Sequence, residues 1–86
     1  MTTHELKTHP EPFAAVLDGR KRFEIRVNDR DFRVADHLLL REWDPATEQY
    51  TGAQARFRVT YMSTGPDWRV PCGLAVMSIA RVMVRS

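Results

Sequence analysis

The chain has 86 residues, of which 43% are hydrophobic and 28% charged, and its formal net charge is +2. This length fits one small domain, the composition is that of a globular rather than a disordered protein, and no apolar run approaches the roughly 20 residues that span a bilayer. A net charge this small excludes a polycation that coats nucleic acid indiscriminately. The single cysteine, Cys72, cannot form an internal disulfide. With no apolar signal region at the N-terminus, we expect a cytoplasmic protein.

The first half of the chain predicts a strand, a helix and a second strand. Residues 3–8 alternate as a strand does, and the segment stops before Pro10 because the residue preceding a proline is pushed out of the helical region. Residues 11–18 carry one apolar stripe at helical spacing, with Gly19 just past the end. Residues 22–28 alternate apolar and charged side chains, which indicates a strand.

The second half predicts three further strands. Residues 36–43 read as a buried strand, and residues 54–62 show the clearest alternation in the chain. Residues 63–72 contain two prolines and two-residue turn signals, which favour irregular structure. Residues 74–84 form a long apolar run typical of a closing strand. Five strands and one main helix predict a mainly β (α+β) fold, a small barrel whose closure removes exposed edges.

The alternation also predicts a core. Because successive side chains of a strand point to opposite faces, the apolar set of residues 22–28 is assigned to the interior and its charged set to the surface. Trp43 and Tyr61 are also expected in the core. The other predicted core residues are Phe23, Ile25, Leu39, Phe57, Val59 and Val76.

Charged side chains are concentrated in residues 18–33, which contain six basic and four acidic residues. Within the predicted strand, Glu24 lies between Arg22 and Arg26, and same-face neighbours on a strand are about 6.5–7 Å apart. This spacing suits a carboxylate bridged by its neighbours and an arginine pre-oriented for phosphate or a base edge. The 11 arginines against 2 lysines favour the same bidentate contacts, although a GC-rich genome produces the same bias. A solvated, self-paired charge run is the alternative explanation.

Gly19, Lys21, Glu24 and Arg26 form a G-x-K-x-x-E-x-R signature. It resembles the signature of ASCH domains, small PUA-like β-barrels proposed as RNA-binding or nucleotide-modifying modules. Blocks along nearly the whole chain resemble a small uncharacterised bacterial and phage branch of that superfamily. These blocks are His4–Lys7, Phe23–Arg26, Asn28–Arg30, Glu42–Trp43, Tyr50–Gly52, Val59–Tyr61 and Val76–Ile79. The resemblance implies a single ASCH-like domain over residues 1–86, with a cleft beside the helix.

Two positions depart from the related sequences. Those sequences usually have glycine at the position of Ala35, so the alanine indicates that this turn does not need a positive φ. They usually have arginine at the position of Ala53, so one cation that would line the family's surface is missing here.

The resemblance implies that four side chains converge in the cleft: Lys7, Lys21, Glu24 and Arg26. We expect the three cations to contact phosphate or base edges and Glu24 to orient them, so the first hypothesis is an RNA- or nucleotide-binding module. A structural ion network in which Glu24 only neutralises its neighbours is the alternative reading of these residues. Trp68 is the candidate for stacking on a base, unless it folds back to cap the barrel.

Two other functions are compatible with the sequence. Some ASCH relatives resemble amidohydrolases acting on acylated cytidine through a lysine and a threonine three residues later. Here Glu24 stands at the threonine position, so a hydrolase acting on a modified nucleoside or RNA would need Glu24 as general base and Lys21 as oxyanion partner. The third hypothesis is a phage or host accessory protein whose cleft binds a carboxylate of a protein partner.

No cofactor or metal site is predicted from the sequence. His4 and His9 are five residues apart across a strand end, a spacing that does not converge on a metal, and His37 precedes a buried strand. His4 belongs to one of the matching blocks and is expected to border the cleft.

Overall fold

The computed structural model describes residues 1–83, which form one five-stranded sheet and one α-helix. The elements are β1 (Thr3–Thr8), α1 (Pro10–Leu17), β2 (Phe23–Val27), β3 (His37–Asp44), β4 (Gln49–Thr64), a short 3-10 helix η1 (Asp67–Arg69) and β5 (Leu74–Arg81). The prediction of a mainly β fold with one main helix is confirmed. β4 is longer than predicted, and the last residue of the predicted closing strand, Val84, lies outside the described residues.

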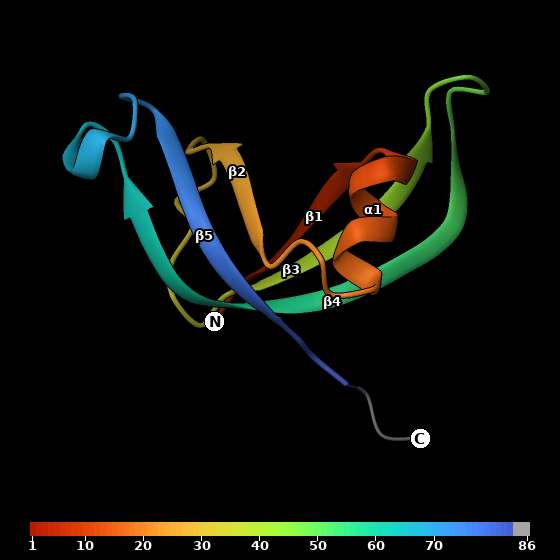
Figure 1. Cartoon of the computed structure of the whole chain (residues 1–86), viewed down its shortest axis with the longest axis horizontal. Helices are drawn as coiled ribbons and strands as arrows, with labels where there is room; N and C mark the ends of the chain where they lie inside the picture. The colour runs from red at the N-terminus through yellow and green to blue at the C-terminus, as the bar shows by residue number, and fades with distance from the viewer. Residues whose placement is uncertain (84–86) are drawn as a thin grey trace.

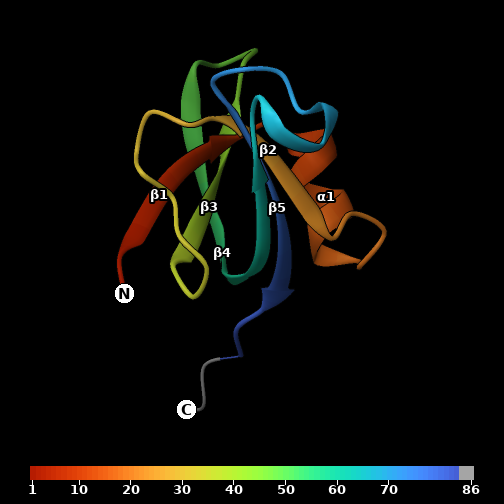
Figure 2. The same ribbon diagram turned by 90° about the vertical axis from the view of Figure 1, so that its left-hand side faces the viewer.

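The sheet is curled into a half-barrel. Its strand order is β1-β3-β4-β5-β2, with β1 parallel to β3 and every other pair antiparallel. The edge strands β1 and β2 therefore face each other across the open side, with α1 beside them (Figure 1). Figure 2 shows β1 on one side of the molecule, and β2 and α1 on the other.

Two arginines span the gap between the edge strands. Arg26 donates from Nη2 to the carbonyl of Lys7 at 3.1 Å, and Arg30 donates from Nη1 to the carbonyl of Glu5 at 2.8 Å. Unpaired edge carbonyls are satisfied here by side chains instead of a neighbouring strand. The predicted barrel is thus a half-barrel whose edges are bridged by guanidinium groups.

The core lies between the concave face of the sheet and α1. α1 begins with proline at its first positions, where the missing N–H costs nothing, and packs Phe13 and Val16 inward. Gly19, with φ +86°, follows its last turn, as predicted. The remaining buried apolar side chains are Leu6, Phe32, Leu38, Leu40, Ala55, Phe57, Val59, Ala75, Met77 and Ile79.

The predicted orientation of β2 is wrong. Phe23 and Ile25 are 46% and 52% exposed, whereas Glu24 is 3% exposed. The cause is the register with β5, which places Glu24 and Arg26 opposite Met77 and Ala75, two residues that point into the core. Cross-strand partners share a face, so β2 turns its charged set inward and its apolar set outward.

The other core predictions hold in part. Phe57 and Val59 are buried as predicted, at 3% and 0% exposure. Leu39 and Val76 are only half-buried, because the odd-numbered positions of β3 and the even-numbered positions of β5 face outward. Trp43 is likewise half-buried.

A β-bulge explains the misplaced Tyr61. Val59 pairs with Ile79, but Tyr61 pairs with Ser78, so β4 contains one extra residue at this point. The extra residue reverses the alternation. Tyr61 is therefore 65% exposed instead of buried, and Met62 packs against the core.

Ala35 does adopt a positive φ, contrary to the prediction. Its φ is +79°, and its N–H donates to the carbonyl of Val59 at 2.8 Å. The turn thus has the left-handed conformation that favours glycine, and the alanine occupies it at a cost.

Within residues 1–83, no helix is both long and apolar enough to cross a membrane.

Candidate functional site

The turn between α1 and β2 positions Lys21. The backbone N–H of Lys21 donates to the carbonyl of Ala15 at 3.0 Å, which ties the turn to the helix. Before it, Asp18 accepts from the backbone N–H of Arg20 at 3.0 Å and from the side chain of Arg20 at 2.7 Å. These hydrogen bonds hold the pKa of the Asp18 carboxyl below its ordinary value. The turn therefore directs Lys21 back toward the beginning of β2.

Glu24 holds two cations, one on each carboxylate oxygen. Lys21 donates from Nζ to Oε1 at 2.5 Å, and Arg26 donates from Nε to Oε2 at 3.0 Å. The Glu24 side chain is 4% exposed, while those of Lys21 and Arg26 are 21% and 27% exposed. A buried carboxylate is tolerated when it is paired and hydrogen-bonded, so two cationic side chains and one carboxylate form one ordered unit with a formal charge of +2 − 1 = +1.

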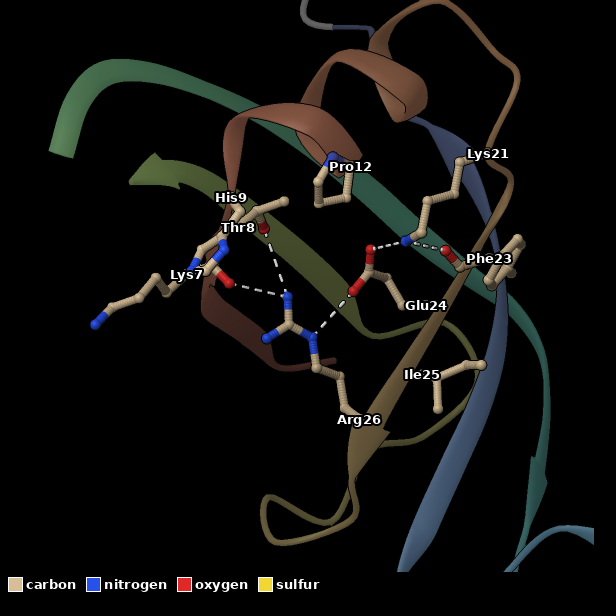
Figure 3. A pocket seen from close by; sticks show the side chains of 9 residues that line it. All are labelled: Lys7, Thr8, His9, Pro12, Lys21, Phe23, Glu24, Ile25 and Arg26. Carbon is tan, nitrogen blue, oxygen red and sulfur yellow. Dashed lines mark hydrogen bonds and ion pairs between the residues drawn. The ribbon is translucent and has the colours of Figure 1, made fainter. Parts of the chain in front are cut away.

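Donors remain free on both cations. Lys21 Nζ also donates to the carbonyl of Phe23 at 2.8 Å, which leaves one of its three N–H groups. Arg26 Nη2 contacts the Lys7 carbonyl and, at 3.5 Å, Thr8 Oγ1. No atom of residues 1–83 accepts a hydrogen bond from Arg26 Nη1. In Figure 3, Lys21 and Arg26 lie on opposite sides of Glu24.

The unit borders a cavity of about 420 Å³ on the open side of the half-barrel. This volume lies within the usual range for small-molecule sites, about 300–1,000 Å³. The lining residues are Lys7, Thr8, His9, Pro12, Lys21, Phe23, Glu24, Ile25 and Arg26. Pro12, Phe23 and Ile25 add apolar side chains to the lining of the cavity. Lys21 Nζ lies 4.9 Å from the centroid of the Phe23 ring.

The structure brings three of the five predicted site residues together. Lys21, Glu24 and Arg26 meet as predicted. Lys7 lines the cavity, but its ammonium group points away from Glu24 (Figure 3) and lies 4.1 Å from the centroid of the Trp43 ring. Trp68 lies in η1, between β4 and β5, and is 82% exposed. It does not cap the barrel, and it is not among the residues that line this cavity.

The expectation for His4 is wrong. Its ring lies inside the protein, where Nε2 is 2.8 Å from Asp36 Oδ2, and both side chains are less than a tenth exposed. Asp36 also accepts from the backbone N–H groups of Thr2 and Arg33, each at 3.1 Å. His4 therefore holds the N-terminus against the turn before β3 and does not border the cavity.

Several lining residues were missed by the sequence analysis. Phe23 and Ile25 were assigned to the core, and Thr8, His9 and Pro12 were assigned no role. A usable signal existed for Phe23, because it lies directly between Arg22 and Glu24 and an alternating strand must present it on the other face. Nothing local marks Thr8 or Pro12, because they reach the cavity only through the curl of the sheet.

Comparison with known proteins gives a family without an assigned activity. A family model described as "Domain of unknown function (DUF3850)" matches residues 3–79. The chain is also 38% identical over 65 residues to the "Uncharacterized 12.9 kDa protein in GpA 3'region" of Escherichia phage P2. The aligned part is 76% of this chain and 58% of the phage protein, so the chain spans less than two thirds of that relative's length.

Proposed function

Because the chain belongs to the family described as domain of unknown function DUF3850, for which no activity is assigned, we propose from the cavity itself that the protein binds RNA or a nucleotide there. The observation that carries the proposal is the pairing of free cationic donors with an exposed aromatic ring. Lys21 and Arg26 keep unused N–H groups, and Phe23 beside them is 46% exposed. Phosphate or a base edge suits the donors, and the flat face of a base suits the ring.

Glu24 orients the two cations in this proposal. Both carboxylate oxygens accept hydrogen bonds from Lys21 or Arg26, so the side-chain positions of the cations are fixed before a ligand enters. Pre-ordering of this kind reduces the entropy lost on binding. The resemblance to ASCH domains supports the same assignment. We also propose that the half-barrel is a PUA-like fold and forms a single domain.

The test is binding of the four ribonucleoside monophosphates and of a single-stranded RNA, measured by calorimetry. Lys21→Ala and Arg26→Ala should each weaken binding about 10- to 150-fold, because a hydrogen bond to a charged group contributes about 1.5–3 kcal/mol. Arg33→Ala is the matched control, because its guanidinium is 74% exposed and pairs with Asp31 outside the cavity. Equal loss in the control, or no binding by the unaltered protein, would contradict the proposal.

The hydrolase alternative is less well supported by the same geometry. A general base needs a carboxylate oxygen available to a water molecule, and both oxygens of Glu24 are held by cations. Hydrolysis of an acylated cytidine or of RNA that is lost in Glu24→Gln, and retained in Glu48→Gln, would establish an enzyme instead.

Protein binding is favoured by one specific observation. Phe23, Ile25 and Val27 are 46–61% exposed along one face of the edge strand β2, and contiguous exposed apolar side chains are typical of interaction surfaces. A phage or host partner carrying a carboxylate could use this rim together with Lys21. Saturable binding to such a partner, with no binding to any nucleotide or RNA, would favour this candidate.

A further inference from the structure

A second surface of ordered cations lies on the convex side of the sheet, away from α1. β1, β3 and the middle of β4 bury every second residue, so the intervening residues face outward. The register arranges these in three cross-strand rows, which are Lys7–Arg41–Gln54, Glu5–Leu39–Arg56 and Thr3–His37–Arg58. The four basic residues of these rows, Lys7, Arg41, Arg56 and Arg58, are called the outer basic face below.

This face concentrates the charge of the molecule. With His37 neutral, its rows hold four cations and one carboxylate, that of Glu5, so their net charge is +4 − 1 = +3, whereas the whole chain has +2. The single carboxylate lies 3.5 Å from Arg41, and both side chains are exposed to solvent. Exposed pairs of this kind are weak, so Glu5 does not neutralise the surface for a polyanion.

Three of the four cations are held in place. Lys7 Nζ lies 4.1 Å from the centroid of the Trp43 ring, and Arg41 Cζ lies 4.1 Å from that of Tyr50. Trp43 and Tyr50 are themselves partners across β3 and β4. Arg56 Nη1 is 3.1 Å from Thr3 Oγ1 and 3.2 Å from His37 Nδ1. Ordered cations lose less freedom when they bind phosphate.

The chemistry of the face fits single-stranded nucleic acid. An arginine stacked on a tyrosine keeps its other planar face open to an unpaired base, and Tyr50 is itself 44% exposed. A lipid surface requires apolar side chains that can enter it, and the one large apolar side chain of the three rows, Leu39, is half-buried. The combination of phosphate-binding cations with stacking planes favours an RNA strand over a membrane.

The face is continuous with the cavity at β1. The carbonyl of Lys7 accepts from Arg26 inside the cavity, while the ammonium group of the same residue lies over Trp43 on the outer side. We propose that the outer basic face binds the single-stranded RNA that continues from the nucleotide in the cavity across β1. The choice of RNA as ligand rests on the proposed function, whereas the position and charge of the face do not.

The test compares a short ligand with a long one. Uridine monophosphate and an oligouridylate of about 12 nucleotides, within the site sizes of single-strand-binding domains, are titrated at several salt concentrations. In Arg56→Ala/Arg58→Ala, affinity for the monophosphate should be unchanged. For the oligouridylate, the slope of log binding constant against log salt concentration should become shallower by about 1.4, since each phosphate contact contributes about 0.7 on single strands. The matched control, Arg33→Ala/Arg69→Ala, removes two positive charges elsewhere and should leave the slope unchanged.

A salt slope equal to that of the unaltered protein, or an equal fall in the control, overturns the inference. Binding of phosphatidylserine vesicles but not of oligouridylate also overturns it. Should the double variant not fold, Arg58→Ala alone decides the question through a fall of about 0.7, because the Arg58 side chain makes no hydrogen bond or ion pair within residues 1–83.

The two proposals fail separately. If the monophosphate does not bind but the oligouridylate keeps a salt slope that depends on Arg56 and Arg58, the function proposed for the cavity is wrong. RNA binding by the outer basic face then stands, but without continuation of the strand from the cavity. If the monophosphate binds through Lys21 and Arg26 and the salt slope is the same with and without Arg56 and Arg58, the function proposed for the cavity stands and RNA binding by the outer basic face is wrong.

Discussion

At the scale of single residues, buried carboxylates organise this small protein in two places. Glu24 holds Lys21 and Arg26 at the cavity, and Asp36 holds His4 and two backbone N–H groups near the beginning of β1. Removal of either carboxylate leaves donors without their acceptor. The cost is larger at Asp36, whose partner His4 is buried, than at Glu24, whose two cations are 21% and 27% exposed. These residues therefore fix local geometry whatever ligand the protein binds.

The first prediction concerns Asp36 and pH. Burial raises the pKa of its carboxyl, but hydrogen bonds from His4, Thr2 and Arg33 outweigh burial and bring the pKa below its ordinary value of 3.8. A carboxyl whose pKa is lowered on folding contributes stability that is present above the unfolded pKa and is lost as the pH falls through the folded pKa. Asp36→Asn should lower the free energy of unfolding by about 2–3 kcal/mol at pH 7, because an amide cannot accept all three bonds.

This difference should shrink as the pH falls below 3.8. Urea unfolding of the two proteins at pH 7 and at pH 3 measures it. A difference of equal size at both pH values would mean that the ionised carboxylate is not the group that stabilises the turn.

The second prediction concerns Ala35. Its φ of +79° costs an L-residue about 1–2 kcal/mol, whereas glycine adopts it freely but loses about 0.4–1 kcal/mol through its more flexible unfolded chain. Ala35→Gly should therefore raise the free energy of unfolding by about 0.5–1 kcal/mol. The control, Ala53→Gly, lies in β4 and should lower it by about the same amount. Chemical denaturation compares the two, and destabilisation by both would contradict the assignment of strain to Ala35.

At the scale of elements, β2 and the bulge in β4 decide which side chains face the core. β2 has strict alternation, yet its apolar set is outside because β5 presents Ala75 and Met77 to its charged set. The apolar rim of the cavity, Phe23 and Ile25, is a consequence of this orientation. A strand at the edge of a half-barrel can turn charged residues inward because the open side gives them room and partners.

The third prediction tests the bulge. Because the extra residue reverses the alternation after Val59, Met62→Ala should lower the free energy of unfolding by about 1–2 kcal/mol, less than a fully buried methionine would lose. Tyr61→Ser should change it by no more than about 0.5 kcal/mol, as an exposed position usually does. Thermal or urea unfolding of both variants distinguishes the bulged register from a regular one, in which Tyr61→Ser would be the more harmful change.

At the scale of the whole molecule, the curl of the sheet creates both candidate surfaces. On its open side β1 lies near β2, so that Arg26 and Arg30 reach the edge carbonyls of β1. The cavity forms between these two strands. Its convex side aligns the outward residues of β1, β3 and β4 into the outer basic face. β1 belongs to both surfaces, because its residue Lys7 contributes its carbonyl to the cavity and its ammonium group to the outer face.

The sequence by itself determined the elements and the charged unit. Helical and strand periodicities depend on near neighbours, so α1 and the five strands could be predicted. The largest error is at the beginning of β4, which starts at Gln49 instead of residue 54. Lys21, Glu24 and Arg26 also lie within six residues of one another, and a turn followed by a strand leaves them few ways to avoid contact.

Only the tertiary structure decided which face of each strand is inside and what surrounds the charged unit. Alternation separates a strand into two faces but does not say which one faces the core, because a distant partner strand sets that choice. Asp36 pairs with His4 across 32 residues, and Arg26 reaches Lys7 across 19. The extra residue in β4 reverses its alternation without any glycine or proline to mark it. Each of these features depends on contacts between segments that are distant in the sequence, and no local pattern carries that information.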